Sequence, residues 1–208
     1  MTAGVLLVGA SGLAREVVAA GMVGITGILD DDQRLHETEI DGVPVLGPVA
    51  LAAERRDRLL VCIGPSAARR SVVRRLRAAG VDDARYETFV ARSARIGSSS
   101  AIGAGTIVLD GVVITAHARV GRHVVIMPNA VITHDDTVAD YATLAAGVAL
   151  GGRVAIGEGA YLGMQSSVRP DVSIGADAVI GMGAAVLHQV PPGETWVGVP
   201  ARRTEEKR

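Results

Sequence analysis

Residues 102–126 read IGAGTIVLDGVVITAHARVGRHVVI, and every sixth position of this stretch is Ile or Val. The period continues without a slip from Val90 to Val186, so that seventeen successive positions hold Ile, Val or Leu. The fourth residue after each of them is almost always Ala, Val, Ser or Thr. A half-buried strand repeats every two residues and a helix about every 3.6, so a period of six fits neither. The repeat predicts a parallel β-helix in which three hexapeptides make one triangular coil.

The same repeat accounts for the unusual composition of the chain. Only 2% of its residues are aromatic, although 49% are hydrophobic, and 26 are glycine. Inward aliphatic side chains and small corner residues fill a narrow interior in which an aromatic ring does not fit. Glycine follows the aliphatic residue in many hexads, as in Ile96-Gly97, and we expect it there because a corner needs a residue with positive φ. Almost six coils, about 4.8 Å apart, predict a prism roughly 27 Å tall.

Charge and hydropathy exclude several classes of function. The formal net charge is −1, which provides no basic surface for nucleic acid or for an anionic membrane. Charged residues or glycine interrupt every apolar run well short of the roughly 18 residues of a membrane-spanning helix. The sequence starts without a basic segment before its apolar residues, so we expect no signal peptide and a cytoplasmic location. The single cysteine, Cys62, lies in an apolar run, which excludes an internal disulfide and predicts a core position.

The first part of the chain lacks the repeat and alternates between strand and helix patterns. Pro44 cannot donate to a ladder, so the short apolar run around it predicts an edge strand. The alternation predicts a small Rossmann-like unit with its ligand site at the carboxyl ends of the strands. We expect strands at residues 5–8, 25–29, 43–46 and 59–63 and helices at 13–20 and 67–79. The predicted organisation is an α/β Rossmann-like domain (1–85), a β-helix domain (86–191) and a C-terminal tail (192–208).

Two loops of this unit are candidates for binding a nucleotide. The turn Gly9-Ala10-Ser11-Gly12 opens the first helix, where backbone N–H groups attract a phosphate. It is not a G-x-G-x-x-G motif, which argues against NAD. Asp30 and Asp31 follow the second strand, where a ribose or a base arrives in such folds. The alternative interpretation, a packing turn and a solvated loop, carries equal weight at this point.

One hexad breaks the rule for the corners. In residues 132–137, ITHDDT, Asp136 occupies the position that is small elsewhere. A carboxylate at an inner corner is costly unless it is hydrogen-bonded, and such exceptions mark functional or strained sites. His134 and Asp135 stand beside it, and a carboxylate that holds one ring nitrogen leaves the other free to take a proton. The hexad therefore predicts His134 as a general base.

The other histidines are weaker candidates. His117 lies one coil before Asp135, so it either supports that carboxylate or acts itself. We expect His123 to be exposed or in an interface, and His36 and His188 to lie on the surface. A zinc site like that of γ-type carbonic anhydrases is disfavoured, because the separations of the histidines differ from the ligand spacing of that family.

Taken together, the motifs resemble the sialic acid O-acetyltransferase family of sugar acyltransferases, which includes the acetyltransferase of bacillosamine synthesis. The resemblance covers nearly the whole chain and implies a left-handed β-helix, acetyl-CoA as co-substrate, no metal, and a homotrimer with active sites between subunits. It rests on GASG at residues 9–12, LDDD at 29–32, CIGPS at 62–66, NAVITHD at 129–135 and VGVPAR at 197–202.

The resemblance also assigns roles by position. His134 matches the catalytic base of the family and Asp135 its acidic neighbour. The acyl-CoA would be bound by Thr143, Gly152, Gly163, Met164, Gly181, Met182, Pro200 and Arg202. The nucleotide-linked sugar would be bound by Gly9, Ala10, Ser11, Gly12, Asp30, Asp31, Gly64 and Pro65. Thr143 stands where several members carry a second histidine, and Leu13 where members often have a histidine after the glycine; both departures leave the acceptor open.

The expected function is acetyl transfer from acetyl-CoA to the amino group of a nucleotide-linked amino sugar. Acetylation of a sugar hydroxyl is the nearest alternative. A β-helix that acts only as a scaffold is the alternative from another class, and it would not bind acetyl-CoA.

Overall fold

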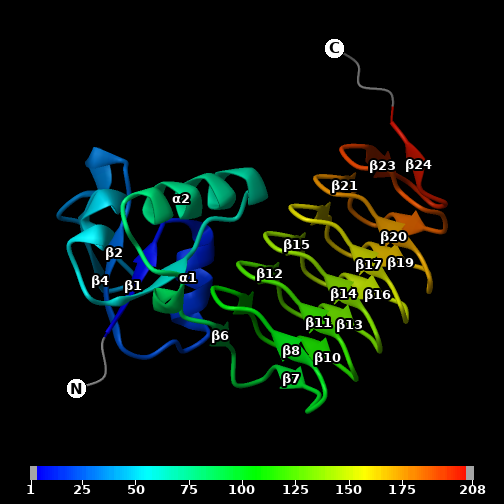
Figure 1. Cartoon of the computed structure of the whole chain (residues 1–208), viewed down its shortest axis with the longest axis horizontal. Helices are drawn as coiled ribbons and strands as arrows, with labels where there is room; N and C mark the ends of the chain where they lie inside the picture. The colour runs from blue at the N-terminus through cyan, green and yellow to red at the C-terminus, as the bar shows by residue number, and fades with distance from the viewer. Residues whose placement is uncertain (1–3, 205–208) are drawn as a thin grey trace.

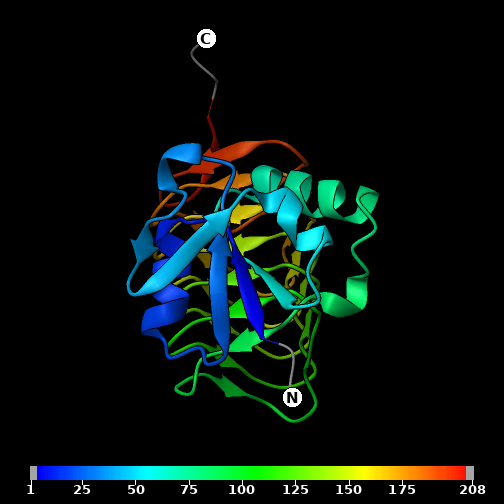
Figure 2. The same cartoon turned by 90° about the vertical axis from the view of Figure 1, so that its left-hand side faces the viewer.

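The structure is a computed structural model that describes residues 4–204. An α/β part lies beside a prism of stacked coils (Figure 1), and the view turned by 90° places that part in front of the prism (Figure 2). Among residues 4–204, no helix has the length and apolar character needed to cross a lipid bilayer.

The α/β part is a five-stranded sheet in the order β3-β4-β2-β1-β5. All neighbouring strands are parallel except the pair β3 and β4. Successive residues of a strand face opposite sides, so Leu7 packs toward α1 while Leu6 packs toward α2. The elements are β1 (Val5–Val8), α1 (Gly12–Ala19), β2 (Ile25–Leu29), η1 (Gln33–Leu35), β3 (Glu39–Ile40), β4 (Val43–Gly47), η2 (Val49–Ala53), β5 (Arg58–Val61), α2 (Ser66–Ala78) and η3 (Asp83–Arg85).

One expectation for this sheet is wrong. The strand that contains Pro44 is not at the edge, because β3 covers it. The ladder bond on that side comes from the next residue, as the amide of Val45 donates to the carbonyl of Thr38 at 2.8 Å. Proline is tolerated inside the sheet because its missing N–H falls where no bond to β3 is required.

The predicted β-helix is confirmed. Seventeen two-residue strands, β6 to β22, each end on one of the seventeen aliphatic positions. Each strand from β6 to β19 pairs in parallel with the strand three places later. The stacked coils fit a left-handed β-helix with three sheets. The strands are β6 (Phe89–Val90), β7 (Arg95–Ile96), β8 (Ala101–Ile102), β9 (Ile107–Val108), β10 (Val113–Ile114), β11 (Arg119–Val120), β12 (Val125–Ile126), β13 (Val131–Ile132), β14 (Thr137–Val138), β15 (Thr143–Leu144), β16 (Ala149–Leu150), β17 (Ala155–Ile156), β18 (Tyr161–Leu162), β19 (Ser167–Val168), β20 (Ser173–Ile174), β21 (Val179–Ile180) and β22 (Ala185–Val186).

The segment expected as a tail extends one of these sheets. Strand β23 (Thr195–Val197) pairs in parallel with β21, and β24 (Arg202–Arg203) folds back on β23 in antiparallel fashion. Residues 205–208 of the expected tail lie outside the described residues.

The expected reason for the glycines after the aliphatic positions is wrong. Positive φ occurs two residues after this position, that is, at every sixth residue from Gly105 to Gly183, whether that residue is glycine or not. Gly157, which follows Ile156, has no positive φ, but a Cβ on it would come within 2.6 Å of the backbone of Gly175 in the next coil. At such hexads glycine is needed after the aliphatic residue because the adjacent coil approaches closely there.

The α/β part covers the face of the prism formed by β6, β9, β12 and β15. Leu13 and Val17 of α1 and Leu60 and Cys62 at β5 pack with Ile107, Leu109 and Val125 of the prism in one buried cluster. Cys62 is fully buried, as predicted, and burial raises the pKa of its thiol. The two parts therefore share a hydrophobic core.

Arg69 of α2 joins the two parts through hydrogen bonds. Its side chain is fully buried. The guanidinium donates to two carbonyl oxygens of residues 63–64 at 2.6 and 2.7 Å. From the same group, N–H donors reach the carbonyls of His123 and Tyr141 in the prism, both at 2.8 Å, and the hydroxyl of Thr143 at 3.0 Å. All these acceptors are neutral, and burial lowers the pKa of Arg69 to about 10.

His123, which was expected to be exposed or in an interface, is buried beneath this joint, where the α/β part meets the prism. Its ring stacks on Tyr141, with centroids 5.3 Å apart, and meets the ring of Tyr86 edge-on at 4.5 Å. Both ring nitrogens lack a hydrogen-bond partner among the described residues. Burial, together with the charges of Arg122 and Arg69, lowers the pKa of His123 to about 4, while Asp140 and Asp83 oppose the shift.

Replacing Arg69 by Met tests the joint. Met keeps an apolar stem but leaves the buried carbonyls without donors, at about 1–3 kcal/mol for each unsatisfied group. We expect the free energy of unfolding, measured by urea titration, to fall by at least about 3 kcal/mol. The exposed Arg74 on the same helix provides the matched control, and Arg74→Met is expected to stay within about 0.5 kcal/mol of wild type. Equal stability of both variants would contradict the role of Arg69.

His123 makes stability depend on pH. In the unfolded chain His123 takes up a proton near its ordinary pKa of 6.5, whereas in the folded protein its pKa is lowered to about 4. The contribution is therefore complete above pH 6.5 and is lost as the pH falls toward 4, with a total of roughly 3 kcal/mol. In urea titrations at pH 7 and 4.5, His123→Phe should lose less stability between the two pH values than wild type. Parallel losses in both proteins would show that His123 does not titrate in this way.

Candidate functional site

His134 and Asp135 form a hydrogen-bonded pair on an outer corner of the prism, in the turn between β13 and β14. Nδ1 of His134 lies 2.8 Å from Oδ2 of Asp135, and each side chain is about half exposed, at 53% and 51%. The backbone of Asp135 has a φ of 62°, a left-handed conformation that Asp tolerates. The hydrogen bond from His134 holds the pKa of Asp135 below its ordinary value. With Nδ1 donating to Asp135, Nε2 carries the lone pair that can accept a proton.

The ring of His134 lies over Gly152, one coil later. A Cβ on Gly152 would collide with Nε2 and Cε1 of the imidazole. In the present structure the histidine ring itself uses the space that the absent side chain leaves, next to the position where the acyl-CoA was expected to pass. Glycine at 152 is thus required for the orientation of the base.

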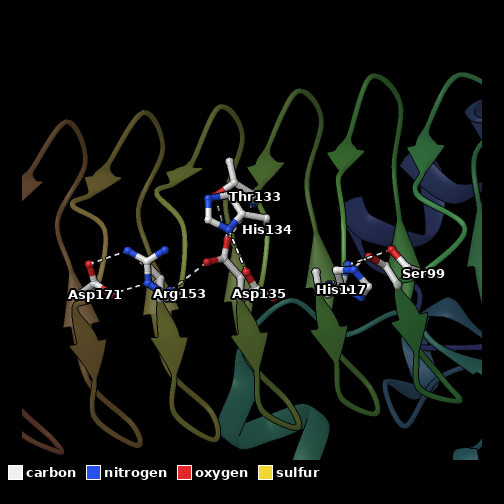
Figure 3. A network of polar contacts seen from close by, with 11 residues as sticks. Ser99, His117, Thr133, His134, Asp135, Arg153 and Asp171 are labelled. Carbon is white, nitrogen blue, oxygen red and sulfur yellow. Dashed lines mark hydrogen bonds and ion pairs between the residues drawn. The ribbon is translucent and has the colours of Figure 1, made fainter.

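Asp135 belongs to a polar column along one corner of the prism (Figure 3). The amide of His117 donates to Oγ of Ser99 at 3.0 Å, and Arg153 forms an ion pair with Asp171 through contacts of 2.6 and 2.9 Å. His117 and Arg153 flank Asp135 from the coils on either side, and their charges help to lower its pKa. The described contacts include no hydrogen bond between His117 and Asp135, so any support from His117 is electrostatic.

A cavity of about 450 Å³ lies between the α/β part and the prism. It contains four of the residues predicted to bind the nucleotide-linked sugar, which come from the loops after β1 and β5. A second hollow of about 790 Å³ shares Gly64, Pro65 and Tyr161 with it and continues along α2 past Arg70 and Arg74. The first cavity is lined by Ser11, Gly12, Leu13, Glu16, Gly64, Pro65, Val125, Met127, Thr143, Ala145, Ala146, Tyr161 and Met164.

The remaining residues predicted for the nucleotide-linked sugar brace these loops. Asp30 accepts from the amide of Ala10 at 2.7 Å and from that of Asp32 at 2.8 Å. Asp31 accepts from the amide of Val49 and pairs with Arg75 at 2.6 Å, which lowers its pKa. Neither carboxylate is among the residues that line the cavity.

The glycine turn is fixed in the same way. Ser11 caps α1, since its hydroxyl accepts from the amide of Leu13 at 3.1 Å, and it donates to the carbonyl of Cys62 at 2.7 Å. Gly9 has a φ of 104°, and a Cβ there would meet Ile63 at 2.7 Å. Gly12 and Gly64, in contrast, face open space, where a Cβ would meet nothing within 4 Å. The structure therefore leaves these two glycines accessible to a ligand.

Thr143 lies apart from His134. It belongs to the sheet that faces the α/β part, is only 5% exposed, and binds Arg69 and Ser66 through its hydroxyl. It lines the cavity, but the His134 pair lies on another corner of the prism. Thr143 thus helps to join the two parts of the chain, and a single chain does not bring it to the candidate base.

The other residues predicted for acyl-CoA lie on later coils. Met164 and Met182 are exposed, at 48% and 70%. Gly163 stacks closely on the next coil, since a Cβ there would come within 2.8 Å of Gly181. Gly181 itself is covered by Val197. Pro200 and Arg202 lie in the exposed hairpin around β24, so these residues follow β18, β21 and β24 along one sheet.

Sequence reasoning missed Arg69, which holds the loop at Gly64 and the side chain of Thr143 in place. A signal was present, because Arg69, Val73 and Leu76 have the spacing of one helix face, and these three are the buried residues of α2. Within residues 4–204, no three His, Cys, Asp or Glu side chains gather in a way that could hold a metal ion.

Comparisons with known proteins agree with this geometry. Residues 153–188 match the family model described as bacterial transferase hexapeptide (six repeats). No curated protein sequence matches the chain.

Solved structures match over nearly the full length. A histidine-to-alanine variant of GDP-perosamine N-acetyltransferase from Caulobacter crescentus, solved in complex with CoA and GDP-perosamine, is 31% identical, with 99% of both chains covered and a TM-score of 0.89. WeeI from Acinetobacter baumannii AYE is 26% identical, covers 98% of this chain and 100% of its own, and has a TM-score of 0.86.

A third structure, the acetyltransferase domain of PglB from Neisseria gonorrhoeae FA1090, shares the fold at 24% identity, with 98% and 100% of the chains covered and a TM-score of 0.88. The resemblance inferred from the motifs is therefore confirmed: the chain belongs to the hexapeptide-repeat sugar acetyltransferases and is an acyltransferase that acts on sugars.

Proposed function

We propose that this protein transfers the acetyl group of acetyl-CoA to the amino group of a nucleotide-linked amino sugar, with His134 as the general base. The observation that carries the proposal is the 31% identity, over 99% of both chains, to an N-acetyltransferase solved with CoA and GDP-perosamine. Variants of that enzyme in which one histidine is replaced by alanine or asparagine have also been solved with both ligands. The cytoplasm, predicted from the sequence, is the compartment that we propose for the reaction.

The cavity between the two parts of the chain is the proposed site of the nucleotide-linked sugar. Gly12 and Gly64 leave room there for a ligand to approach the backbone. They lie at the N-terminal ends of α1 and α2, where backbone N–H groups favour an anion such as a diphosphate. This use of the carboxyl edge of a parallel sheet is that of a Rossmann-like domain.

The chemistry follows from the His134–Asp135 pair. The amine of the sugar attacks the thioester carbon, an N–C bond forms, and Nε2 of His134 takes the proton of the amine. The C–S bond then breaks, and the proton passes from His134 to the departing CoA sulfur. Asp135, whose pKa is held low, remains a carboxylate and stabilises the imidazolium that forms transiently. No step requires a metal.

A homotrimer is part of the proposal. In one chain, the base and the cavity lie on different parts of the prism, so a complete site needs a second chain whose cavity faces the His134 corner. Exposed apolar side chains on the last coils, Met182, Val197 and Val199 among them, support contacts of this kind or with the acyl-CoA. Placing both substrates between subunits would supply much of the rate by orientation.

The decisive measurement is CoA release from acetyl-CoA with a panel of nucleotide-linked amino sugars. Wild type should turn over at least one of them, and His134→Ala should lower kcat by roughly 10²–10⁴-fold, the usual contribution of a general base. His188→Ala, which alters an exposed histidine outside the polar column of Asp135, is the matched control and should keep kcat within about threefold.

Each other outcome has a definite meaning. Full activity of His134→Ala would remove the general-base role. Turnover only with sugars that present a hydroxyl would make the protein an O-acetyltransferase. Absence of acetyl-CoA binding by wild type would reduce the β-helix to a scaffold.

A further inference from the structure

The ladder between coils is interrupted beside His134. The residue that follows a two-residue strand normally donates its amide to the next coil, where the acceptor is the carbonyl of the second residue of the paired strand. Thr115, which follows β10, donates in this way to Ile132 of β13 at 3.0 Å. Of the strands β6 to β19, thirteen keep this bond and β13 does not. The amide of Thr133 donates to Oδ2 of Asp136 instead, at 2.7 Å.

The strand pairing shows the same interruption. Strands β10 and β13 are paired through both of their residues, whereas β13 and β16 are paired through Val131 and Ala149 alone. The carbonyl of Leu150, which would receive the amide of Thr133, is left out of the ladder. The break is therefore a local feature of the coil that carries His134.

Asp136 causes the break at a cost. Its side chain is fully buried at a corner where other hexads hold small residues, and burial raises the pKa of the carboxyl. Its second oxygen, Oδ1, accepts from the amide of Val154 in the next coil at 2.8 Å. One carboxylate thus satisfies two amides from two coils, which offsets part of the desolvation penalty.

These bonds surround the candidate base. The amide of Thr133 directly precedes His134, and Asp136 directly follows Asp135. Val154 belongs to the coil that carries Gly152, over which the ring of His134 lies. Backbone bonds tie this turn to both neighbouring coils, from the amide of Asp135 to the carbonyl of Ala116 and from the amide of Arg153 to the carbonyl of His134, both at 3.0 Å. The two oxygens of Asp136 add one bond within the turn and one to the coil that receives the ring.

We propose that Asp136 is a positioning residue for the His134–Asp135 pair: it diverts the amide of Thr133 from the ladder and holds the turn where the imidazole lies over Gly152. The inference rests on the proposed role of His134 as the base.

Ser100 separates this role from ordinary corner capping. It stands in the same corner column two coils earlier and bridges coils in its own way, donating to Thr115 O at 2.8 Å and accepting from the amide of Ala118 at 3.0 Å. In its coil the amide of Gly97 still donates to the carbonyl of Ile114. Bridging two coils at this corner therefore does not require a break in the ladder.

The test compares Asp136→Ala, Asp136→Asn and the control Ser100→Ala. For Asp136→Ala we expect kcat to fall by roughly 10²-fold, as for a small displacement of a catalytic group, with KM for acetyl-CoA within about twofold. Its Tm should change little: the amide of Val154 loses its acceptor, but the desolvation penalty of a buried carboxylate is removed and the bond from Thr133 to Leu150 can form. Asp136→Asn should be intermediate, since its amide oxygen can still accept from Thr133. Ser100→Ala should keep the wild-type kcat.

A crystal structure of Asp136→Ala provides a readout that does not depend on activity. We expect the amide of Thr133 to donate to the carbonyl of Leu150 and the ring of His134 to move from its place over Gly152. The proposal would be overturned if the ring of His134 did not move in Asp136→Ala. It would also be overturned if this variant kept the wild-type kcat, whether or not its Tm fell. Failure of the proposed function looks different: wild type would then be inactive, or His134→Ala fully active, whatever the structure of Asp136→Ala shows.

Discussion

Each strand of the β-helix from β6 to β19 is bonded to the strand eighteen residues later, and this register places residues of one kind in columns along the prism. Aliphatic columns fill the interior, and positive φ at every sixth position turns the corner side chains outward. The register therefore also determines which residues of the two adjacent coils lie beside His134 and Asp135. His117 and Arg153 act on Asp135 in this way, and Gly152 gives the imidazole its place.

The α/β part adds what the register cannot supply, a cavity beside the prism. Its position depends on a shared apolar core and on Arg69, whose guanidinium binds only neutral acceptors of both parts. The loop at Gly64 is held from one side by Arg69, and the turn at Ala10 is held by Asp30. Charged groups that were predicted to bind a ligand thus hold the loops of the cavity in place, and two accessible glycines, Gly12 and Gly64, lie in its lining.

The sequence allowed the β-helix and the His134–Asp135 pair to be predicted because both depend on short separations. A six-residue period indicates which residues face inward. His134 and Asp135 are adjacent in the chain, so their contact could be predicted without the fold. The errors concern what lies outside the prism or one coil away. His123 is buried only because the α/β part covers its corner, and Arg69 is buried only because the prism supplies its acceptors. A glycine such as Gly157, which follows an aliphatic residue, is needed for the approach of the next coil.

Asp136 shows how an exception in a regular pattern can be interpreted physically. A hydroxyl is sufficient to connect two coils at this corner, as Ser100 demonstrates, and it leaves the ladder intact. A carboxylate has two oxygens and no proton to donate, so it can accept from an amide within its own turn and from another in the next coil at once. Oδ2 of Asp136 accepts from the amide of Thr133, and Oδ1 accepts from the amide of Val154. The choice of aspartate is thus explained by the displacement of one amide, and that amide belongs to the residue before the candidate base.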